Sequence, residues 1–228
     1  EQALPPAKPG PAWREFGAGT LRGRVTLPLL GAAGSTVTFC VDGVAVQTVD
    51  TWLPWAQVRA WVDDPGLTLN ASQSAVVEDD RRRAARDAVA EGGRAFLRAA
   101  ARELSAERPE GSLAGKDWGR FAELLPWLRE ACGRLLKSPE TTGEPLLSVL
   151  RDAPVLLDVC YGALSLGALE AEKKAGGTVS WSQKPCPGLH PPGRVAWADD
   201  KATRDFLKSH FHDLRDLTGL VESLTRVP

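Results

Sequence analysis

The amino-acid sequence predicts an α/β fold, in which an α+β first subdomain is joined by a helical connector to a small α/β sandwich. Apolar and polar residues alternate along residues 21–49, as in strands, and apolar residues recur at helical spacing along residues 75–136. The last third returns to short apolar runs that alternate with helical segments. We expect a tail (1–19), a β-α-β subdomain with a long helix (20–106), a helical connector (107–152) and a small α/β subdomain (153–228).

The first predicted elements are strands. Leu21–Leu29 alternates apolar and polar residues, as a strand with one buried face does. Thr36–Val49 is predicted to form two strands around Asp42-Gly43, because an Asp-Gly pair between β-forming residues is a strong hairpin signal. Residues 1–19 are rich in Pro, Ala and Gly, which predicts a tail whose end is held against the sheet by Trp13 and Phe16.

The stretch Val58–Ser74 is the centre of the first subdomain. We expect it to begin as the end of an apolar helix, because large apolar residues recur there at helical spacing. These residues are Trp52, Trp55, Val58, Trp61 and Val62. A turn is predicted at residues 63–66 from the sequence Asp-Asp-Pro-Gly. Ser74 suits the N-cap of a helix over Ala75–Ala106, since its hydroxyl can accept a backbone N–H. The sequence thus predicts a polar loop between two helices, and this loop is the first place to look for a chemical site. Its tip is formed by Asn70, Ser72, Gln73 and Ser74.

The helix predicted over Ala75–Ala106 carries two further features. Gly92-Gly93 weakens its middle, and we interpret the pair either as a close approach by the sheet or as a kink. An arginine cluster lies near its start, made of Arg81, Arg82, Arg83 and Arg86. Glu78–Arg82 and Asp79–Arg83 have the acid-first i,i+4 order that stabilises an exposed helix. We therefore interpret the cluster as a solvated helix face, with phosphate binding as the alternative.

The connector and the last third differ in pattern. In the connector, Pro126 either kinks a helix or starts a new one, and a short helix is predicted over Leu146–Arg151. Pro154–Tyr161 is a continuous apolar run, which predicts a strand covered on both faces. The elements expected after it are a helix over Leu166–Ala175 capped by Ser165, strands at Val179–Ser182 and Arg194–Ala198, a helix over Thr203–Phe211 and a last element over Leu214–Val221. This order predicts mainly parallel strands.

Composition excludes several classes of function. The 228 residues are 43% hydrophobic and 25% charged, as in globular domains. A net charge of −1 gives no electrostatic footprint for nucleic acid, so no nucleic-acid partner is expected. No apolar run approaches the roughly 20 residues that span a bilayer, so no membrane partner is expected either. Four widely spaced cysteines predict reduced thiols and a cytoplasmic protein. The absence of Met predicts a processed chain or a piece of a longer one.

The usual catalytic motifs are absent from the sequence. It contains no G-x-x-x-x-G-K-[ST] phosphate loop, no G-x-G-x-x-G after a strand and no G-x-S-x-G elbow, so we expect no stand-alone enzyme. Zinc ligation is the alternative weighed for Cys186, His190, His210 and His212. Their spacing fits no standard zinc module, and no metal is expected. The acidic residues Asp199, Asp200, Glu170 and Glu172 are interpreted as caps and solvated faces.

The loop and its flanks resemble the middle segment of the ninety-kilodalton heat-shock chaperones, which are ATPases of the GHKL superfamily. Members of that family typically have the sequence valine-arginine-glycine-valine-valine-aspartate, followed by a short acidic turn. After the turn comes leucine-proline-leucine-asparagine, then any residue, then serine-arginine-glutamate. The matching residues here are Val58, Arg59, Val62, Asp63, Leu67, Leu69, Asn70 and Ser72. The chain departs at Gln73 and Ser74, where the family carries arginine and glutamate. In the family that arginine reaches the γ-phosphate held by the preceding ATPase domain.

The resemblance implies a module that couples ATP binding on a neighbouring domain to client proteins. ATP and Mg are then cofactors of that neighbour, with none in this chain, and the nucleotide-facing loop is Asn70, Ser72 and Gln73. Trp13 and Trp52 are the candidate contacts for clients or other partners. Two other classes remain open: a protein-interaction scaffold that kept the fold but lost ATPase coupling, and a DNA-acting GHKL relative. The neutral Gln73 favours the scaffold, and the mild acidity disfavours the DNA-acting class.

Overall fold

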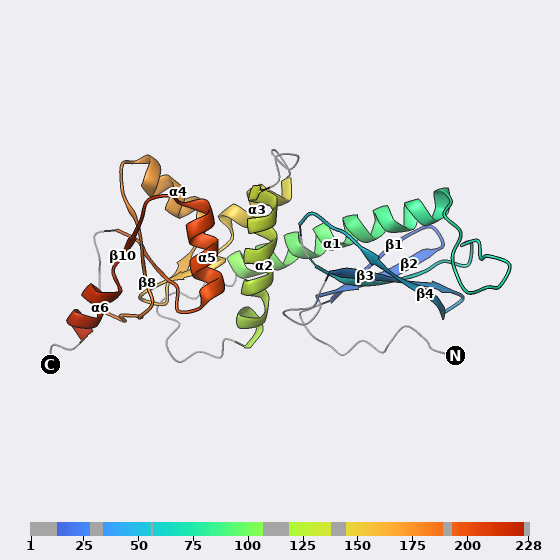
Figure 1. The fold of residues 1–228 in the computed structure, drawn as a ribbon, viewed down its shortest axis with the longest axis horizontal. Helices are drawn as coiled ribbons and strands as arrows, with labels where there is room; N and C mark the ends of the chain where they lie inside the picture. Colours follow the sequence, from blue (N-terminus) through green and yellow to red (C-terminus); the bar gives the residue numbers. More distant parts are fainter. Residues whose placement is uncertain are drawn as a thin grey trace. The chain divides into compact units, whose positions relative to one another are not determined.

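The computed structural model describes residues 13–27, 34–55, 57–106, 119–137, 145–188 and 193–225. Within these residues the chain forms helices and two five-stranded sheets, which confirms the predicted α/β class (Figure 1). It divides into two compact units, Glu1–Leu97 and Arg98–Pro228. The stretch predicted to be a separate connector, 107–152, falls in the second unit.

The first unit is built on a sheet with the strand order β1-β2-β5-β3-β4. Its strands are β1 (Trp13–Ala18), β2 (Leu21–Thr26), β3 (Ser35–Val41), β4 (Val44–Thr51) and β5 (Arg59–Asp63). β3 and β5 pair in parallel, and the other neighbours pair antiparallel. The hairpin predicted at Asp42-Gly43 is confirmed: both residues have positive φ, 51° and 81°, which suits the twist of a tight two-residue turn.

The helix predicted over Trp52–Val62 is wrong, because this stretch contains the strand β5. Ala60 and Val62 are buried against the core, whereas Trp61 between them is only half-buried, so the chain alternates with period two. β5 lies between β2 and β3 and has backbone partners on both sides. The helical spacing of the tryptophans has no structural counterpart. Trp52 is exposed and Trp55 is buried.

β1 lies inside the segment predicted to be a tail. It pairs antiparallel with β2 along its whole length, from Trp13 opposite Thr26 to Ala18 opposite Leu21. As an edge strand it exposes most of its side chains, so its sequence lacks the apolar alternation that reveals a strand with one buried face.

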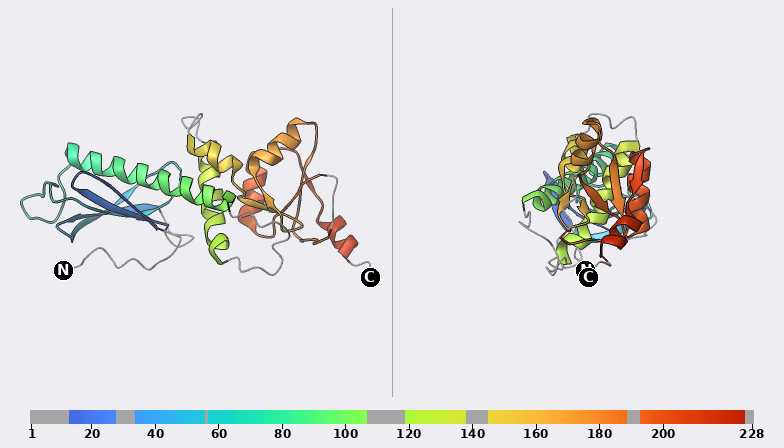
Figure 2. Two further views of the ribbon diagram at one scale, coloured as in Figure 1. Left: turned by 180° about the vertical axis from the view of Figure 1, so that it is seen from behind. Right: turned by 90° about the vertical axis from the view of Figure 1, so that its left-hand side faces the viewer.

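The long helix α1 (Asp80–Ala106) lies, in its part that belongs to the first unit, along one face of this sheet (Figures 1 and 2). It begins five residues later than predicted, and Ser74 is not its N-cap. Instead Asp79 accepts a hydrogen bond from the Arg82 N–H at 2.8 Å, as an N-cap carboxylate does. Apolar residues from both sides form the core between helix and sheet: Leu21, Val37, Phe39, Ala60, Val62, Leu67, Val76, Ala85 and Val89.

The glycine pair in α1 lets two aromatic rings pack directly against the helix backbone. Of the two interpretations of this pair, a close approach by the sheet or a kink, the structure therefore supports the close approach. A Cβ added at Gly92 would lie 2.6 Å from Cδ1 of Phe16 on β1. One added at Gly93 would lie 2.2 Å from Cη2 of Trp55. Both contacts are shorter than any real Cβ contact, so the rings occupy the space that any other residue would need.

The second unit is built on a mixed sheet with the strand order β10-β8-β9-β6-β7. Its strands are β6 (Leu156–Asp158), β7 (Ala163–Leu164), β8 (Val179–Ser182), β9 (Val195–Trp197) and β10 (Leu214–Asp216). β8 is parallel to β9 and β10, as predicted, but β6 is antiparallel to β7 and β9. The strand predicted over Pro154–Tyr161 is present but shorter, because β6 covers only Leu156–Asp158. Asp158 accepts hydrogen bonds from the Cys160 and Gly162 N–H groups and so turns the chain after β6.

The helices of the second unit follow the predicted signals closely. They are α2 (Gly119–Lys137), α3 (Pro145–Asp152), α4 (Leu166–Lys174), α5 (Lys201–His210) and α6 (Thr218–Thr225). α2 runs through Pro126, so no new helix starts there. Ser165 caps α4 as predicted, accepting the Ala168 N–H at 3.1 Å. Gly176, with φ of 88°, follows the end of α4.

The packing of Trp55 against Gly93 yields a stability prediction. Gly93→Ala raises helix propensity by about 0.5–1 kcal/mol, but it forces the Trp55 ring out of its place. We expect net destabilisation of about 1–3 kcal/mol, as for other overpacked cores. Urea unfolding followed by Trp fluorescence measures it. The matched control is Ala84→Gly at an exposed site of the same helix, which should cost only about 0.5–1 kcal/mol. A Gly93→Ala chain as stable as wild type would contradict this packing.

Candidate functional site

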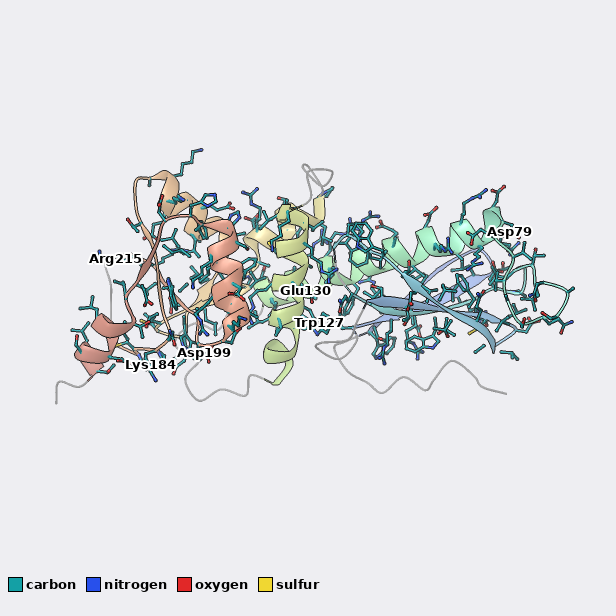
Figure 3. All side chains as sticks on the ribbon, in the orientation of Figure 1. Asp79, Trp127, Glu130, Lys184, Asp199 and Arg215 are labelled. Carbon is teal, nitrogen blue, oxygen red and sulfur yellow. The ribbon has the colours of Figure 1, made fainter. Side chains whose placement is uncertain are left out.

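The loop predicted to be the site lies between β5 and α1 rather than between two helices. Its ends are joined as in a small hairpin: the Val77 N–H donates to Thr68 O at 2.8 Å and the Asn70 N–H to Ala75 O at 2.9 Å. Leu69 and Val76 form a β-bridge between these two bonds. The loop leads into the start of α1, close to Asp79 (Figure 3). Residues 70–75 therefore form a closed structure.

Asn70 organises the inside of this loop. Its Oδ1 accepts the Ser74 N–H at 2.9 Å and the Ala75 N–H at 3.2 Å. Its backbone carbonyl accepts the Gln73 N–H at 2.9 Å. Asn side chains commonly hold turns in this way. One residue thus supplies acceptors for three consecutive backbone N–H groups, so the loop is preformed.

Gln73 stands at the tip of the loop with a left-handed backbone, φ 53°. Left-handed φ is uncommon for a residue other than Gly, Asn or Asp, and here the hydrogen bonds on either side impose it. Gln73 is exposed, and its side-chain amide has no hydrogen-bond partner among the described residues. Ser72 and Ser74 are also exposed, and their hydroxyls lie 2.8 Å apart. The loop therefore presents an unused amide, which can donate and accept hydrogen bonds, on a rigid support.

The base of the loop is held by side chains from the sheet and the helix. The Val76 N–H donates to Oε1 of Gln47 on β4 at 3.0 Å. Nη1 of Arg82 donates to the Val76 carbonyl at 2.7 Å. Arg82 is buried, lies 3.1 Å from Glu78 and stacks over the Phe39 ring at 5.3 Å. The backbone of Val76 is thus held by hydrogen bonds at both its N–H and its carbonyl.

A second anchor joins the turn before the loop to the first turn of α1. Asp64 is buried, and its carboxylate accepts hydrogen bonds from Nε and Nη2 of Arg81, each at 2.8 Å. The Thr20 hydroxyl donates to Asp64 at 3.0 Å and accepts from Arg81 at 2.7 Å. The hydrogen bonds from Arg81 lower the pKa of Asp64 to about 2. This carboxylate stays ionised at neutral pH and serves as a structural tie.

The arginine cluster of α1 is engaged in pairs, as the preferred interpretation predicted. Arg82 pairs with Glu78 at the expected i,i+4 spacing. Arg83 pairs with Asp80 rather than with the predicted Asp79, whose carboxylate caps the helix. Arg86 also pairs with Glu78, at 2.9 Å. Because each arginine already faces a carboxylate, the cluster offers little attraction to a phosphate.

The two candidate partner contacts lie at opposite edges of the sheet. Trp13 is on β1, half-buried, with the Arg24 guanidinium 4.9 Å from its ring. Trp52 directly follows β4 and is 75% exposed. β1 and β4 are the two edge strands, so these residues do not form one patch.

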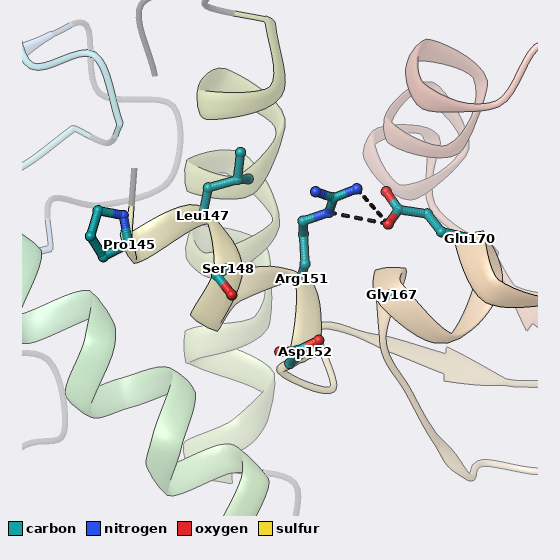
Figure 4. Close-up of a pocket in the computed structure, with 7 residues that line it drawn as sticks. All are labelled: Pro145, Leu147, Ser148, Arg151, Asp152, Gly167 and Glu170. Carbon is teal, nitrogen blue, oxygen red and sulfur yellow. Dashed lines mark hydrogen bonds and ion pairs between the residues drawn. The ribbon is translucent and has the colours of Figure 1, made fainter. Parts of the chain in front are cut away.

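In the second unit, Glu170 on α4 is held between two side chains far from it in sequence. Its Oε2 accepts hydrogen bonds from Arg151 on α3 at 2.6 and 3.1 Å, and its Oε1 lies 2.6 Å from Nε2 of His210. Arg151 and Glu170 line a cavity of about 330 Å³ between α3 and α4 (Figure 4). Both carboxylate oxygens of Glu170 are therefore engaged, and the residue ties α4 to α3 and to the end of α5.

The other residues weighed from sequence are also accounted for. Asp200 caps α5, accepting the Thr203 N–H at 2.7 Å, and Glu172 accepts the Arg194 N–H at 3.2 Å. Of the residues weighed for zinc, Cys186 is buried and His212 is exposed, while His190 lies outside the described residues. Among the residues that the structure describes, no group of three or more His, Cys, Asp or Glu side chains can hold a metal ion.

Sequence reasoning found the loop but missed what supports it. Gln47, Asp64 and Arg81 were not expected at the site, because they come from three separate segments: β4, the turn after β5, and α1. Comparisons with protein-family models and with curated proteins gave no match for this chain. No helix in the described part of the chain is long and apolar enough to cross a membrane.

The role of Asp64 predicts a pH dependence of stability. Its pKa is lowered from 3.8 to about 2 in the fold. The stability it contributes is therefore present above pH 4 and is lost as pH falls through about 2. Between pH 5.5 and pH 2.5, the stability difference between wild type and Asp64→Asn should shrink by about 1.5 kcal/mol. Urea unfolding at the two pH values measures it. Asp80→Asn, which removes an exposed carboxylate, is the control, and a similar shrinkage there would count against the assignment.

The hydrogen bonds of Asn70 predict a local effect. Asn70→Ala removes the acceptor for the Ser74 and Ala75 N–H groups, which is worth about 1 kcal/mol. Amide hydrogen exchange at these two residues should accelerate several-fold while the core strands exchange as before. Ser72→Ala is the control, because among the described residues its hydroxyl contacts Ser74 alone. Unchanged protection in Asn70→Ala would show that the loop is held in another way.

Proposed function

We propose that the chain is the middle, transducer-type module of a heat-shock-type molecular chaperone of the GHKL class. In this proposal, ATP and Mg bind to a neighbouring domain, nucleotide closure there docks the loop Asn70–Ser74, and the module offers apolar surface to client proteins. The observation that carries the proposal is the preformed loop, closed by backbone bonds and by Asn70, with the free Gln73 amide at its tip.

Rigidity is what such coupling requires. A loop that reports closure of a neighbouring domain must keep its shape when it is pushed, because a flexible loop would absorb the movement. Here Gln47 and Arg82 hold Val76, while Asp64 and Arg81 hold the two ends of the segment. Force on Gln73 is therefore carried into β4, β5 and α1 together.

The chemistry of Gln73 sets an upper limit on its catalytic role. A neutral amide can donate a hydrogen bond to a phosphate, but it lacks the charge and the forked donors of arginine. An arginine that contacts the transferred phosphoryl group contributes several orders of magnitude to turnover. We therefore propose that Gln73 senses the nucleotide and contributes weakly to its hydrolysis.

The second candidate is a protein-interaction scaffold without ATPase coupling. The neutral residue at position 73 and the exposure of Trp52 both favour it. A DNA-acting GHKL relative is less well supported, because the arginine cluster of α1 is paired with carboxylates. A reducing, cytoplasmic setting is proposed from the four cysteines, none of which forms a disulfide.

Substitution of Gln73 tests the proposal. We expect Gln73→Arg to raise ATP turnover of the protein that joins this module to its ATPase domain by tenfold or more, equal to about 1.4 kcal/mol. Gln73→Ala should lower turnover. Gln73→Asn is the matched control for the backbone, since Asn tolerates the left-handed conformation and keeps an amide on a shorter side chain. Equal turnover in all four proteins would make the loop structural and favour the scaffold.

A further inference from the structure

Among the described residues, the outer edge of β4 has no backbone hydrogen-bond partner. β4 is the last strand of its sheet and pairs with β3 alone. Within the described part of the chain, no backbone hydrogen bond other than those of the β3–β4 ladder involves residues 44–51. A row of outward N–H and C=O groups of this kind is a template for a further strand.

Over residues 47–51, β4 carries little of the protection that sheet edges commonly have. Its eight residues, VAVQTVDT, contain one charge, Asp50, and no Lys or Pro. An irregularity in the β3–β4 pairing occurs between Phe39 and Cys40, toward the Val44 end, so the pairing from Gln47 to Thr51 is regular. The opposite edge strand, β1, differs: it carries the charged residues Arg14 and Glu15, which are exposed. Of the two edge strands, β4 is therefore the one more accessible to an added strand.

The side chains around β4 define what would fit there. Val46 and Val49 pack on the core beneath α1 but are only half-buried. Apolar side chains of an added strand would extend this core. Val44 is 54% exposed at one end of β4, and Trp52 is 75% exposed just beyond the other. Asp50 favours a neutral or basic residue opposite it and disfavours an acidic one.

We infer that β4 binds an extended segment of an unfolded client protein, which adds to the sheet as a further strand beside β4. The segment alternates apolar with neutral or basic side chains, and Trp52 covers its apolar end. β-strand addition is an established mode of peptide recognition, in which backbone bonds give affinity and alternate side chains give specificity. The identity of the partner as a client rests on the proposed function, whereas the strand-adding chemistry rests on β4 itself.

The same strand reaches the candidate loop. Gln47 lies in the middle of β4, and its side chain accepts the Val76 N–H at the base of the loop. A strand added beside β4 restricts the backbone of Gln47 and so acts on residues 70–76. This contact is a direct physical link between client binding and the loop that holds Gln73.

Peptide binding to the full chain tests the inference. The probe is an eight-residue peptide that alternates Val with Thr or Lys. We expect it to bind and to slow amide hydrogen exchange at residues 44–51. An analogue with Pro at two adjacent central positions removes one outward N–H on each of its edges. It should bind at least tenfold more weakly.

Variants of the chain locate the site. Asp50→Lys should weaken binding of the Lys-containing peptide about tenfold and favour a peptide in which Glu replaces Lys. Trp52→Ala should weaken binding several-fold, whereas Leu220→Ala, which truncates another exposed apolar side chain on α6, should not. Equal binding of the Pro analogue, or protection that falls outside β4, would overturn the inference. Self-association of the peptide-free chain with protection of β4 would overturn it too, because the occupant would then be a second copy.

The peptide-binding test of β4 can succeed or fail independently of the test of the proposed function. Peptide binding is measured without nucleotide, so it does not depend on Gln73 or on any ATPase activity. In the protein with its ATPase domain, the peptide should change ATP turnover, and Asn70→Ala, which loosens the loop without altering β4, should abolish that change while leaving peptide binding within twofold. If turnover fails to respond to Gln73 but the peptide still binds β4, the coupling proposal fails and the strand-adding site stands.

Discussion

The ion pair between Asp64 and Arg81 is the interaction on which the rest of the first unit depends. Asp64 ends the segment that leaves β5, Arg81 lies in the first turn of α1, and the whole candidate loop runs between them. The carboxylate is buried, so loss of its partner would leave a charge in the core, which is one of the larger costs a fold can incur. The pair therefore sets where α1 starts relative to the sheet. With Arg81 held in this way, the next residue, Arg82, turns inward to the Val76 carbonyl and the Phe39 ring.

This arrangement makes the loop a rigid part of the sheet rather than an appendage of the helix. Its shape is imposed from inside by Asn70 and from below by Gln47 and Arg82. The two proposals depend on the same set of bonds. In the proposed function, docking of Gln73 against a nucleotide would be transmitted through the rigid base of the loop. In the further inference, client binding at β4 would reach the loop through Gln47, which belongs to both. A neutral Gln73 fits a module whose main task is to transmit a movement.

Local signals in the sequence predicted local structure well. Asp42-Gly43 formed the expected turn, Ser165 capped the expected helix and Gly176 followed its end, because each of these depends on one residue's own backbone preference or hydrogen bond. The errors arose where periodicity was ambiguous. The tryptophans before β5 matched helical spacing, yet the strand's own alternation, with Ala60 and Val62 buried, was decided by pairing with β2 and β3. Likewise the apolar run after Pro154 was broken by a turn that Asp158 holds.

The sequence by itself determined the α/β class, the position and polar character of the loop, and the absence of a standard catalytic motif. These follow from composition, short-range spacing and single-residue preferences, all of which are readable along the chain. Only the tertiary structure decided that Gly92 and Gly93 make room for the rings of Phe16 and Trp55. It also decided that Arg81 pairs with Asp64, that Gln47 holds Val76, and that β4 is an edge strand. Each of these joins residues from different elements. Such contacts depend on strand order and helix placement, which no local pattern in the sequence specifies.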